Sequence, residues 1–130
     1  MGGELGHFEE ALEAGGIAWW MMQLPSGVVF FSDYKVKVLG YKPKDFVHYT
    51  NFTDLLHKDD HAKAMKAMKD HIDGKSELYE VKYRIKAKDG SYKIFYDRGK
   101  ITAKDKKGNI TISGIVINLT DHSFEHGIKK

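Results

Sequence analysis

The feature that most constrains the fold is a run of alternating residues near the C-terminus, YRIKAKDGSYKIFYDRGKITAKDKKGNITISGIVINLTD, residues 83–121. Apolar and charged side chains alternate here and from Tyr79 onward, as in a strand with one face on a core and one in solvent. Two groups of turn residues, KDG and KDKKGN, interrupt the alternation. The run therefore predicts three strands joined by two hairpins. Because Ile115, Val116 and Ile117 are apolar in succession, we expect the last strand to be central and buried on both faces.

A helical pattern precedes this run in the segment DDHAKAMKAMKDHIDG, residues 59–74. Its apolar residues recur at three- and four-residue spacing with lysines between them, which is typical of an amphipathic helix packed on a core. These apolar residues are Ala62, Met65, Met68 and Ile72. We expect Asp59 or Asp60 to cap the start of the helix and Gly74 to end it.

The first half of the chain predicts smaller elements. The runs IAWWMMQL and VVFFS flank the turn residues PSG, and this arrangement predicts a hairpin over residues 17–32. Residues 33–56 contain short apolar clusters broken by glycine and proline, which favour several helices of one or two turns. Phe8 and Leu12, four residues apart within residues 7–14, predict a short amphipathic helix.

This order of elements defines a fold class. Two strands, a group of short helices, one longer helix and three further strands make an α+β domain, a five-stranded antiparallel sheet with its helices over one face. The outer face of such a sheet needs a cover. We expect it to be either the N-terminal helix or a second copy of the chain.

Composition limits the function classes. With 130 residues and 42% hydrophobic content, the chain has enough material for one core, so we expect a single domain over residues 1–130. It has no cysteine, which excludes disulfides, thiolate metal sites and cysteine nucleophiles. A net charge of +3 with scattered lysines argues against nucleic acid as a partner. No apolar run is long enough for a membrane span, so we expect a cytoplasmic location.

Five segments in order resemble the PAS domains of bacterial and archaeal signalling proteins. They are WWMMQLPSGVVFFS, VLGYKPKDF, FTDLLHKDD, YEVKYRIKAKDGSYKIF and DKKGNITISGIVINLTD, and the resemblance covers residues 15–122. Two positions depart from the family pattern. Lys58 stands where a proline is common after the histidine, and Ile94 and Phe95 stand where a tryptophan is common.

The resemblance implies a sensory domain joined to an effector. In this family the end of the last strand leads into a helix that connects to a histidine kinase of a two-component system, a diguanylate cyclase or a chemoreceptor. Asn118, Thr120 and Asp121 match that ending and are expected to relay the signal. Residues 123–130 would then begin the connector, and residues 1–14 would form the N-terminal helix. The alternative is a ligand-free interaction module that forms a homodimer through Phe8 and Leu12.

The resemblance also places a pocket for a small ligand between the inner face of the sheet and the helices. Apolar walls with a few hydroxyl groups suit such a ligand, although they also suit a packed core. The implied lining is Phe30, Phe52, Leu56, Met65, Met68, Ile72, Tyr83, Tyr96 and Ile112. By the same pattern, Trp20 faces the core and Trp19 the outer surface.

His71 raises the question of a cofactor, because haem-binding PAS domains take an iron ligand from the long helix near its end. The alternative is a solvated histidine stabilised by the C-terminal helix dipole. Flavin chemistry of the light-sensing type needs a cysteine, so the sequence excludes it.

The remaining polar residues predict structural roles. The segment HKDDH, residues 57–61, has metal-ligand residue types, but we interpret it as a helix cap and a histidine that holds the loop, with no metal. Arg84 is expected to pair with a carboxylate across the sheet, with binding of a ligand carboxylate as the alternative. No nucleophile, base and orienting group occur together, so we predict no catalytic site.

Overall fold

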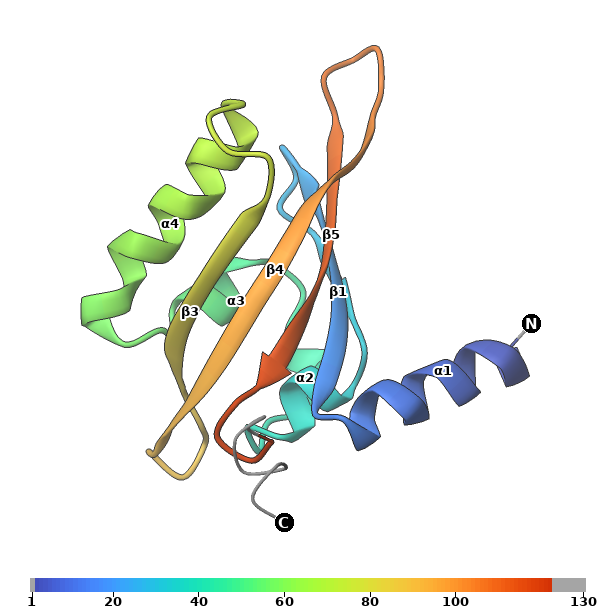
Figure 1. Cartoon of the computed structure of the whole chain (residues 1–130), viewed down its shortest axis with the longest axis vertical. Coiled ribbons are helices and arrows are strands. Elements are labelled where there is room, and N and C mark those ends of the chain that lie inside the picture. Colours follow the sequence, from blue (N-terminus) through green and yellow to red (C-terminus); the bar gives the residue numbers. More distant parts are fainter. Residues whose placement is uncertain (1, 123–130) are drawn as a thin grey trace.

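The structure, a computed structural model, describes residues 2–122 and contains one five-stranded antiparallel sheet (Figure 1). The strand order is β2-β1-β5-β4-β3, so the last strand is central, as the sequence predicts. The strands are β1 (Ile17–Leu24), β2 (Val29–Phe31), β3 (Tyr79–Lys86), β4 (Tyr92–Lys104) and β5 (Ile110–Asn118).

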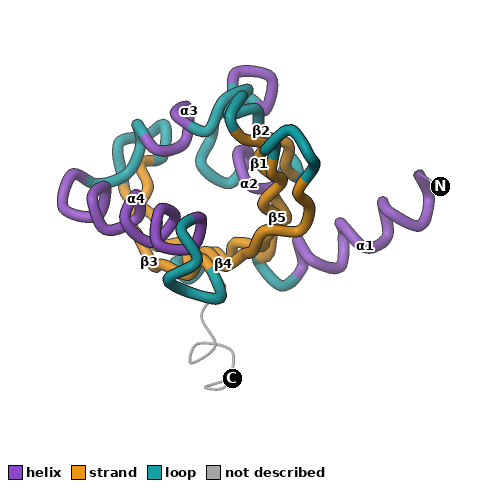
Figure 2. Tube along the Cα trace, turned by 90° about the horizontal axis from the view of Figure 1, so that it is seen from above, coloured by secondary structure: helices purple, strands orange, loops and turns teal. Residues whose placement is uncertain are grey.

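The helices α2, α3 and α4 lie on one side of the curved sheet, whereas α1 extends away from it (Figure 2). The helical elements are α1 (Gly2–Ala14), α2 (Tyr34–Lys37), the 3₁₀ turn η1 (Pro43–Asp45), α3 (Thr50–Thr53) and α4 (Lys58–Ile72). This α+β arrangement confirms the predicted fold class. Within residues 2–122, no helix is both long and apolar enough to cross a bilayer.

The outer face of the sheet is less covered than the sequence suggests. Ile115 on the central strand is 38% exposed, and Tyr92 and Ile94 on β4 are also exposed. The prediction that β5 is buried on both faces is therefore wrong for its outer face. The reason is that α1 touches the sheet only near β1, where the Trp19 indole N–H donates to Glu9 Oε2 at 3.1 Å, and then leaves it (Figure 1).

A row of five paired residues crosses the inner face of the sheet and explains two glycines in the middle of strands. In this row Phe31 pairs with Trp20, Trp20 with Gly114, Gly114 with Gly99, and Gly99 with Tyr79. Because the two glycines carry no side chains, the Trp20 indole lies across them and meets the Tyr79 ring edge-on, with 5.9 Å between ring centroids. The glycines thus form the floor on which Trp20 rests.

The longer helix, α4, begins differently from the prediction. His57, and neither Asp59 nor Asp60, is its N-cap residue, because the His57 Nδ1 accepts a hydrogen bond from the Asp59 backbone N–H at 3.0 Å. Asp60 is instead buried and holds the helix to β3 through Arg84. The helix ends as expected, with Gly74 at a positive φ of 79° just beyond it.

Candidate functional site

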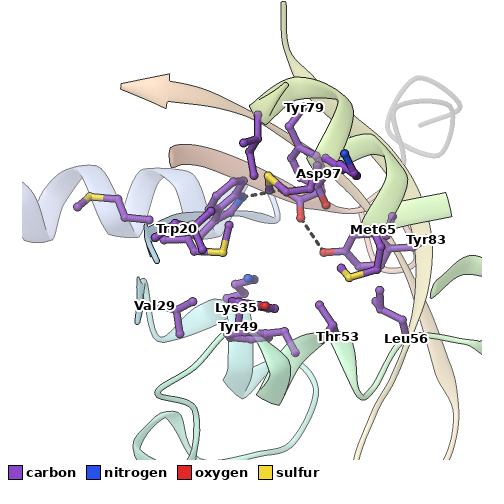
Figure 3. Close-up of a pocket in the computed structure, with 18 residues that line it drawn as sticks. Trp20, Val29, Lys35, Tyr49, Thr53, Leu56, Met65, Tyr79, Tyr83 and Asp97 are labelled. Carbon is purple, nitrogen blue, oxygen red and sulfur yellow. Dashed lines mark hydrogen bonds between the residues drawn. The ribbon is translucent and has the colours of Figure 1, made fainter. Parts of the chain in front are cut away.

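A cavity of about 270 Å³ lies between the inner face of the sheet and helices α2, α3 and α4 (Figure 3). Most of its walls are apolar: Trp20, Met22, Val29, Phe52, Leu56, Ala64, Met65 and Met68. The polar side chains that line it are Lys35, Tyr49, Thr53, Lys69, Tyr79, Tyr83 and Asp97. A few polar groups within apolar walls are typical of a site for a small organic molecule.

The structure brings six of the nine predicted pocket residues to this cavity. Those six are Phe52, Leu56, Met65, Met68, Ile72 and Tyr83. The other three lie elsewhere. Phe30 is 46% exposed on the outer face of β2, and Ile112 is fully buried in the core beside the cavity. The Tyr96 hydroxyl bonds the Glu80 carboxylate on the outer face, because the inward residues of β4 are Phe95, Asp97 and Gly99.

Asp97 is the acidic group of the cavity and is only 5% exposed. The Trp20 indole N–H donates to its Oδ1 at 2.6 Å, and the Tyr83 hydroxyl donates to its Oδ2 at 2.8 Å. Figure 3 shows both bonds on the sheet side of the cavity. Burial raises the pKa of Asp97, and the charge of Lys35 together with these two donors opposes that rise. Both oxygens therefore accept hydrogen bonds, as those of an ionised carboxylate do.

Lys35 is a basic group of the cavity and is 7% exposed, on the buried side of α2 with Val36. Its Nζ lies 3.7 Å from the centroid of the Phe52 ring and 5.9 Å from that of Trp20, which are cation–π contacts. Within residues 2–122 this ammonium group forms no hydrogen bond and no ion pair. Burial lowers its pKa to about 8, and the negative charge of Asp97 partly offsets that shift.

The stability of the protein should therefore rise with pH in a window that Lys35 sets. Between its folded pKa of about 8 and its usual pKa of 10.5, the unfolded chain binds more protons than the folded chain, so the free energy of unfolding increases with pH. From pH 7 to pH 9.5, wild type should gain about 2 kcal/mol relative to Lys35→Met. Urea unfolding of both proteins at the two pH values measures this gain.

The difference between the two proteins serves as the control for other groups in this window. The other titratable groups that line the cavity are Asp97 on β4, Tyr79 and Tyr83 on β3, Tyr49 before α3 and Lys69 on α4. They are present in both proteins, and burial raises the pKa of Tyr79 and of Tyr83 above 10, outside the window. Parallel stability curves for wild type and Lys35→Met would contradict the prediction.

His71 holds the end of α4 to the sheet and is 7% exposed. Its Nδ1 lies 3.0 Å from the Ser76 carbonyl oxygen, and its Nε2 accepts from the Ile101 backbone N–H at 2.9 Å. Both ring nitrogens are thus occupied by backbone groups, and His71 does not line the cavity. Its burial contradicts the interpretation of a solvated histidine, and both ring nitrogens are engaged with backbone groups where the haem interpretation needs one of them for iron.

Removing the His71 imidazole should lower the free energy of unfolding by about 2–3 kcal/mol. His71→Phe preserves an aromatic ring but leaves the Ile101 N–H and the Ser76 carbonyl, which meet the imidazole at a partly buried contact, without these partners. His71→Gln, whose amide can still accept from Ile101, should recover part of the loss. Chemical denaturation of the three proteins measures this, and equal stability of the Phe and Gln variants would show that the two hydrogen bonds contribute little.

The segment HKDDH does not gather its side chains into one site. Asp60 forms a two-pronged ion pair with Arg84, with its Oδ2 2.8 Å from Nε and its Oδ1 3.0 Å from Nη2. Hydrogen bonds from Arg84 hold the pKa of Asp60 well below its usual range. Arg84 therefore pairs with a carboxylate of α4, where the sequence predicted one across the sheet. Among residues 2–122, no three potential metal-ligand side chains lie together.

The predicted relay residues form one network at the end of β5. Asn118 Nδ2 donates to Asp121 Oδ2 at 2.7 Å, and Lys93 Nζ donates to the same oxygen at 2.7 Å. The Ile94 backbone N–H donates to Thr120 Oγ1 at 2.7 Å. These bonds attach the residues after β5 to the start of β4. The expected connector, residues 123–130, lies outside the described residues.

Neither of the two buried charged residues of the cavity, Asp97 and Lys35, was predicted from the sequence. Asp97 follows Phe95 by two positions and precedes Gly99 by two, so the three share a face of β4. A correct choice of phase in that strand would therefore have found Asp97. Lys35 lies in a helix of four residues, which is too short for its periodicity to show an inward side chain.

Comparison with known proteins identifies the family. A family model described as PAS fold matches residues 28–116, more than half of the chain. The chain therefore belongs to the PAS fold family, which confirms the resemblance found in the sequence. The methyl sulfide methyltransferase-associated sensor of Methanosarcina acetivorans is 28% identical over 98 residues, 74% of this chain. The match spans only 10% of that relative.

Two solved structures show the same fold. One is a sensory box histidine kinase/response regulator from Burkholderia thailandensis, with a TM-score of 0.71, 21% identity, and coverage of 95% of this chain and 92% of that one. The other is the N-terminal domain of a diguanylate cyclase with PAS/PAC sensor from Marinobacter aquaeolei, with a TM-score of 0.71, 17% identity, and coverage of 85% and 98%.

Proposed function

We propose that this chain is a sensory domain that binds a small ligand in the cavity and passes the resulting change to an effector. The observation that carries the proposal is the cavity itself, with two buried charged side chains on its walls. A core that serves only for packing gains nothing from a buried charge, which costs several kcal/mol to remove from water. Such a cost is commonly tolerated where a site has a use for the charge.

The relay would run along the sheet to its C-terminal end. Asp97 on β4 is paired with Val116 on β5, two residues before Asn118. A ligand that contacts Asp97 or its partner Trp20 therefore acts on the strand that ends in the network of Asn118, Thr120 and Asp121. A ligand shifts the output only by as much as it binds one arrangement better than the other. The domain acts in this way by binding, without a catalytic step.

The relatives support this class of function and suggest the kind of effector. Their names describe a sensor, a histidine kinase and a diguanylate cyclase. We propose a cytoplasmic domain that regulates an effector of the kinase, cyclase or chemoreceptor type, with residues 15–122 as the sensory core.

Native mass spectrometry of the purified protein, compared with the denatured protein, tests the proposal. A bound small molecule appears as a mass excess that is lost on denaturation. Ala64→Leu fills the cavity from α4 with a residue that favours helices, and it should lower the fraction of protein carrying this excess. Ala62→Leu, at an exposed position of the same helix, is the matched control and should preserve it. Equal ligand content in the two variants would place the molecule outside the cavity.

A second function, a dimerisation module, is favoured by one observation on α1. Leu5 is 52% exposed and Phe8 is 68% exposed on a helix that extends away from the sheet, whereas Leu12 is half-buried (Figure 1). Exposed apolar side chains on a projecting helix suit a contact with a second copy. Phe8→Glu should then abolish the dimer in sedimentation velocity, and thermal stability should rise with protein concentration. A dimer that survives Phe8→Glu would exclude this contact.

A further inference from the structure

The cavity contains two opposite charges that do not pair with each other. Asp97 has a donor on each of its oxygens, whereas the Lys35 ammonium group has only the ring faces of Phe52 and Trp20. Among the described residues, no carboxylate forms an ion pair with Lys35, although the charge of Asp97 still acts on it. Figure 3 shows Lys35 and Asp97 on opposite walls, one from the helices and one from the sheet.

Both charged groups lie close to the Trp20 indole. Its ring centroid is 5.9 Å from Lys35 Nζ, and its Nε1 is 2.6 Å from Asp97 Oδ1. Both charged groups thus lie beside the same indole, where a head group with an anionic and a cationic group on one carbon is placed to make a charge-assisted hydrogen bond of about 2.8 Å to each. An ionised carboxylate accepts about four hydrogen bonds, so Asp97 retains the capacity to accept from a ligand.

Charge balance distinguishes the classes of ligand. A ligand with only a carboxylate would satisfy Lys35 but would add a net negative charge to the cavity and leave Asp97 without a counter-charge. A ligand with only an amine would satisfy Asp97 but would add a net positive charge to the cavity and leave Lys35 without a counter-charge. A neutral zwitterion gives each buried charge a partner and adds no net charge in a place of low dielectric constant.

The remaining walls limit the rest of the ligand. Met22, Leu56, Met65 and Met68 are apolar and line the same cavity. At about 30 Å³ for each non-hydrogen atom, the share of a water molecule in the liquid, a cavity of about 270 Å³ holds roughly nine such atoms. Methionine side chains also adapt their shape to the group that contacts them.

Resting on the proposed sensory function, we infer that the cavity binds a small zwitterionic α-amino acid with an apolar side chain. Its carboxylate accepts from Lys35, its ammonium group donates to Asp97, and its side chain lies among the methionines of α4 and β1.

Isothermal titration calorimetry with shape-matched probes tests the inference on the ligand-free protein. The probes are L-leucine, 4-methylpentanoate, which lacks the amine, and 3-methylbutylamine, which lacks the carboxylate. L-Valine, L-methionine and L-phenylalanine cover other side chains. The best amino acid should bind at least tenfold more tightly than 4-methylpentanoate and than 3-methylbutylamine. A factor of about ten in affinity is expected for one hydrogen bond to a charged group.

Variants at Lys35 and at Asp97 test which residue binds each charged group of the ligand. In Lys35→Met the preference for L-leucine over 3-methylbutylamine should fall to less than threefold, and Lys35→Gln provides the same comparison with a polar side chain. In Asp97→Asn, which preserves groups that can bond Trp20 and Tyr83, the preference for L-leucine over 4-methylpentanoate should fall to less than threefold. Preferences that persist in these variants would overturn the assignment.

The outcomes separate this inference from the proposed function. The neutral analogue 3-methylbutan-1-ol is added to the same titrations. If it binds and none of the four amino acids does, the cavity takes ligands but the zwitterion inference is wrong. The same conclusion follows if 4-methylpentanoate binds as tightly as L-leucine. If no probe binds and native mass spectrometry shows no bound molecule, both the inference and the proposed sensory function are wrong.

Discussion

Gly114→Ala is expected to lower the free energy of unfolding by about 3 kcal/mol or more, at the upper end of what overpacking costs. A methyl group at this position would overlap the Arg98 carbonyl oxygen and lie 2.6 Å from Cζ2 of Trp20. The neighbouring strand cannot move without breaking its pairing with β5, so the indole must leave its floor. Urea denaturation, followed by tryptophan fluorescence and by circular dichroism, measures the loss.

The control for this variant is a glycine with free space around it. Gly6 lies within α1, where an added Cβ meets nothing within 4 Å, so Gly6→Ala should cost no stability and should favour the helix. If Gly114→Ala lost less than about 1 kcal/mol, the close approach of Trp20 to the sheet would not exist in the native state.

Asp97→Ala should be the second severe change, with a loss of about 3–5 kcal/mol. The substitution removes the acceptor of the Trp20 N–H and of the Tyr83 hydroxyl, both of which are buried, and it leaves the charge of Lys35 without a counter-charge. Chemical denaturation at pH 7 measures the loss. We expect the indole environment to change as well, which near-ultraviolet circular dichroism detects.

Two further variants separate the charge from the hydrogen bonds. Asp97→Asn keeps an oxygen for the Trp20 N–H and should lose clearly less than Asp97→Ala. The double variant Lys35→Met with Asp97→Leu replaces both charges by apolar groups and should recover part of the stability. The stability loss of the double variant is compared with the summed losses of Lys35→Met and Asp97→Leu measured singly. If the two values are equal, Lys35 and Asp97 do not interact.

Patterns with one clear face gave reliable predictions. In β3 the apolar residues Tyr79, Val81, Tyr83 and Ile85 alternate with charged ones, and the structure buries the former and leaves the latter toward solvent. The order of elements, the central place of β5 and the family were also predictable. The domain boundaries stay a prediction.

Patterns that are apolar on both faces did not reveal which residues face the cavity. In β4 the aromatic residues Phe95 and Tyr96 are adjacent, as are Phe30 and Phe31 in β2, so periodicity allows either phase. In both strands the residue predicted to line the pocket, Tyr96 or Phe30, faces outward. His71 was misjudged for another reason. It lies on the inward face of α4 with Ala64 and Met68. The spacing of apolar residues does not include a histidine, so it cannot predict that this side chain is buried and bonds backbone groups.

The attachment of α4 at both ends has a consequence for how the cavity can change size. Asp60 ties the first turn to Arg84 of β3, and His71 ties the last turn to Ile101 of β4. The helix is therefore anchored at both ends, and it can neither slide along the sheet nor tilt away from it without breaking one of these two contacts. Ligands of different length would then be accommodated by the rotamers of Met65 and Met68 near mid-span, while the backbone of this wall keeps its position.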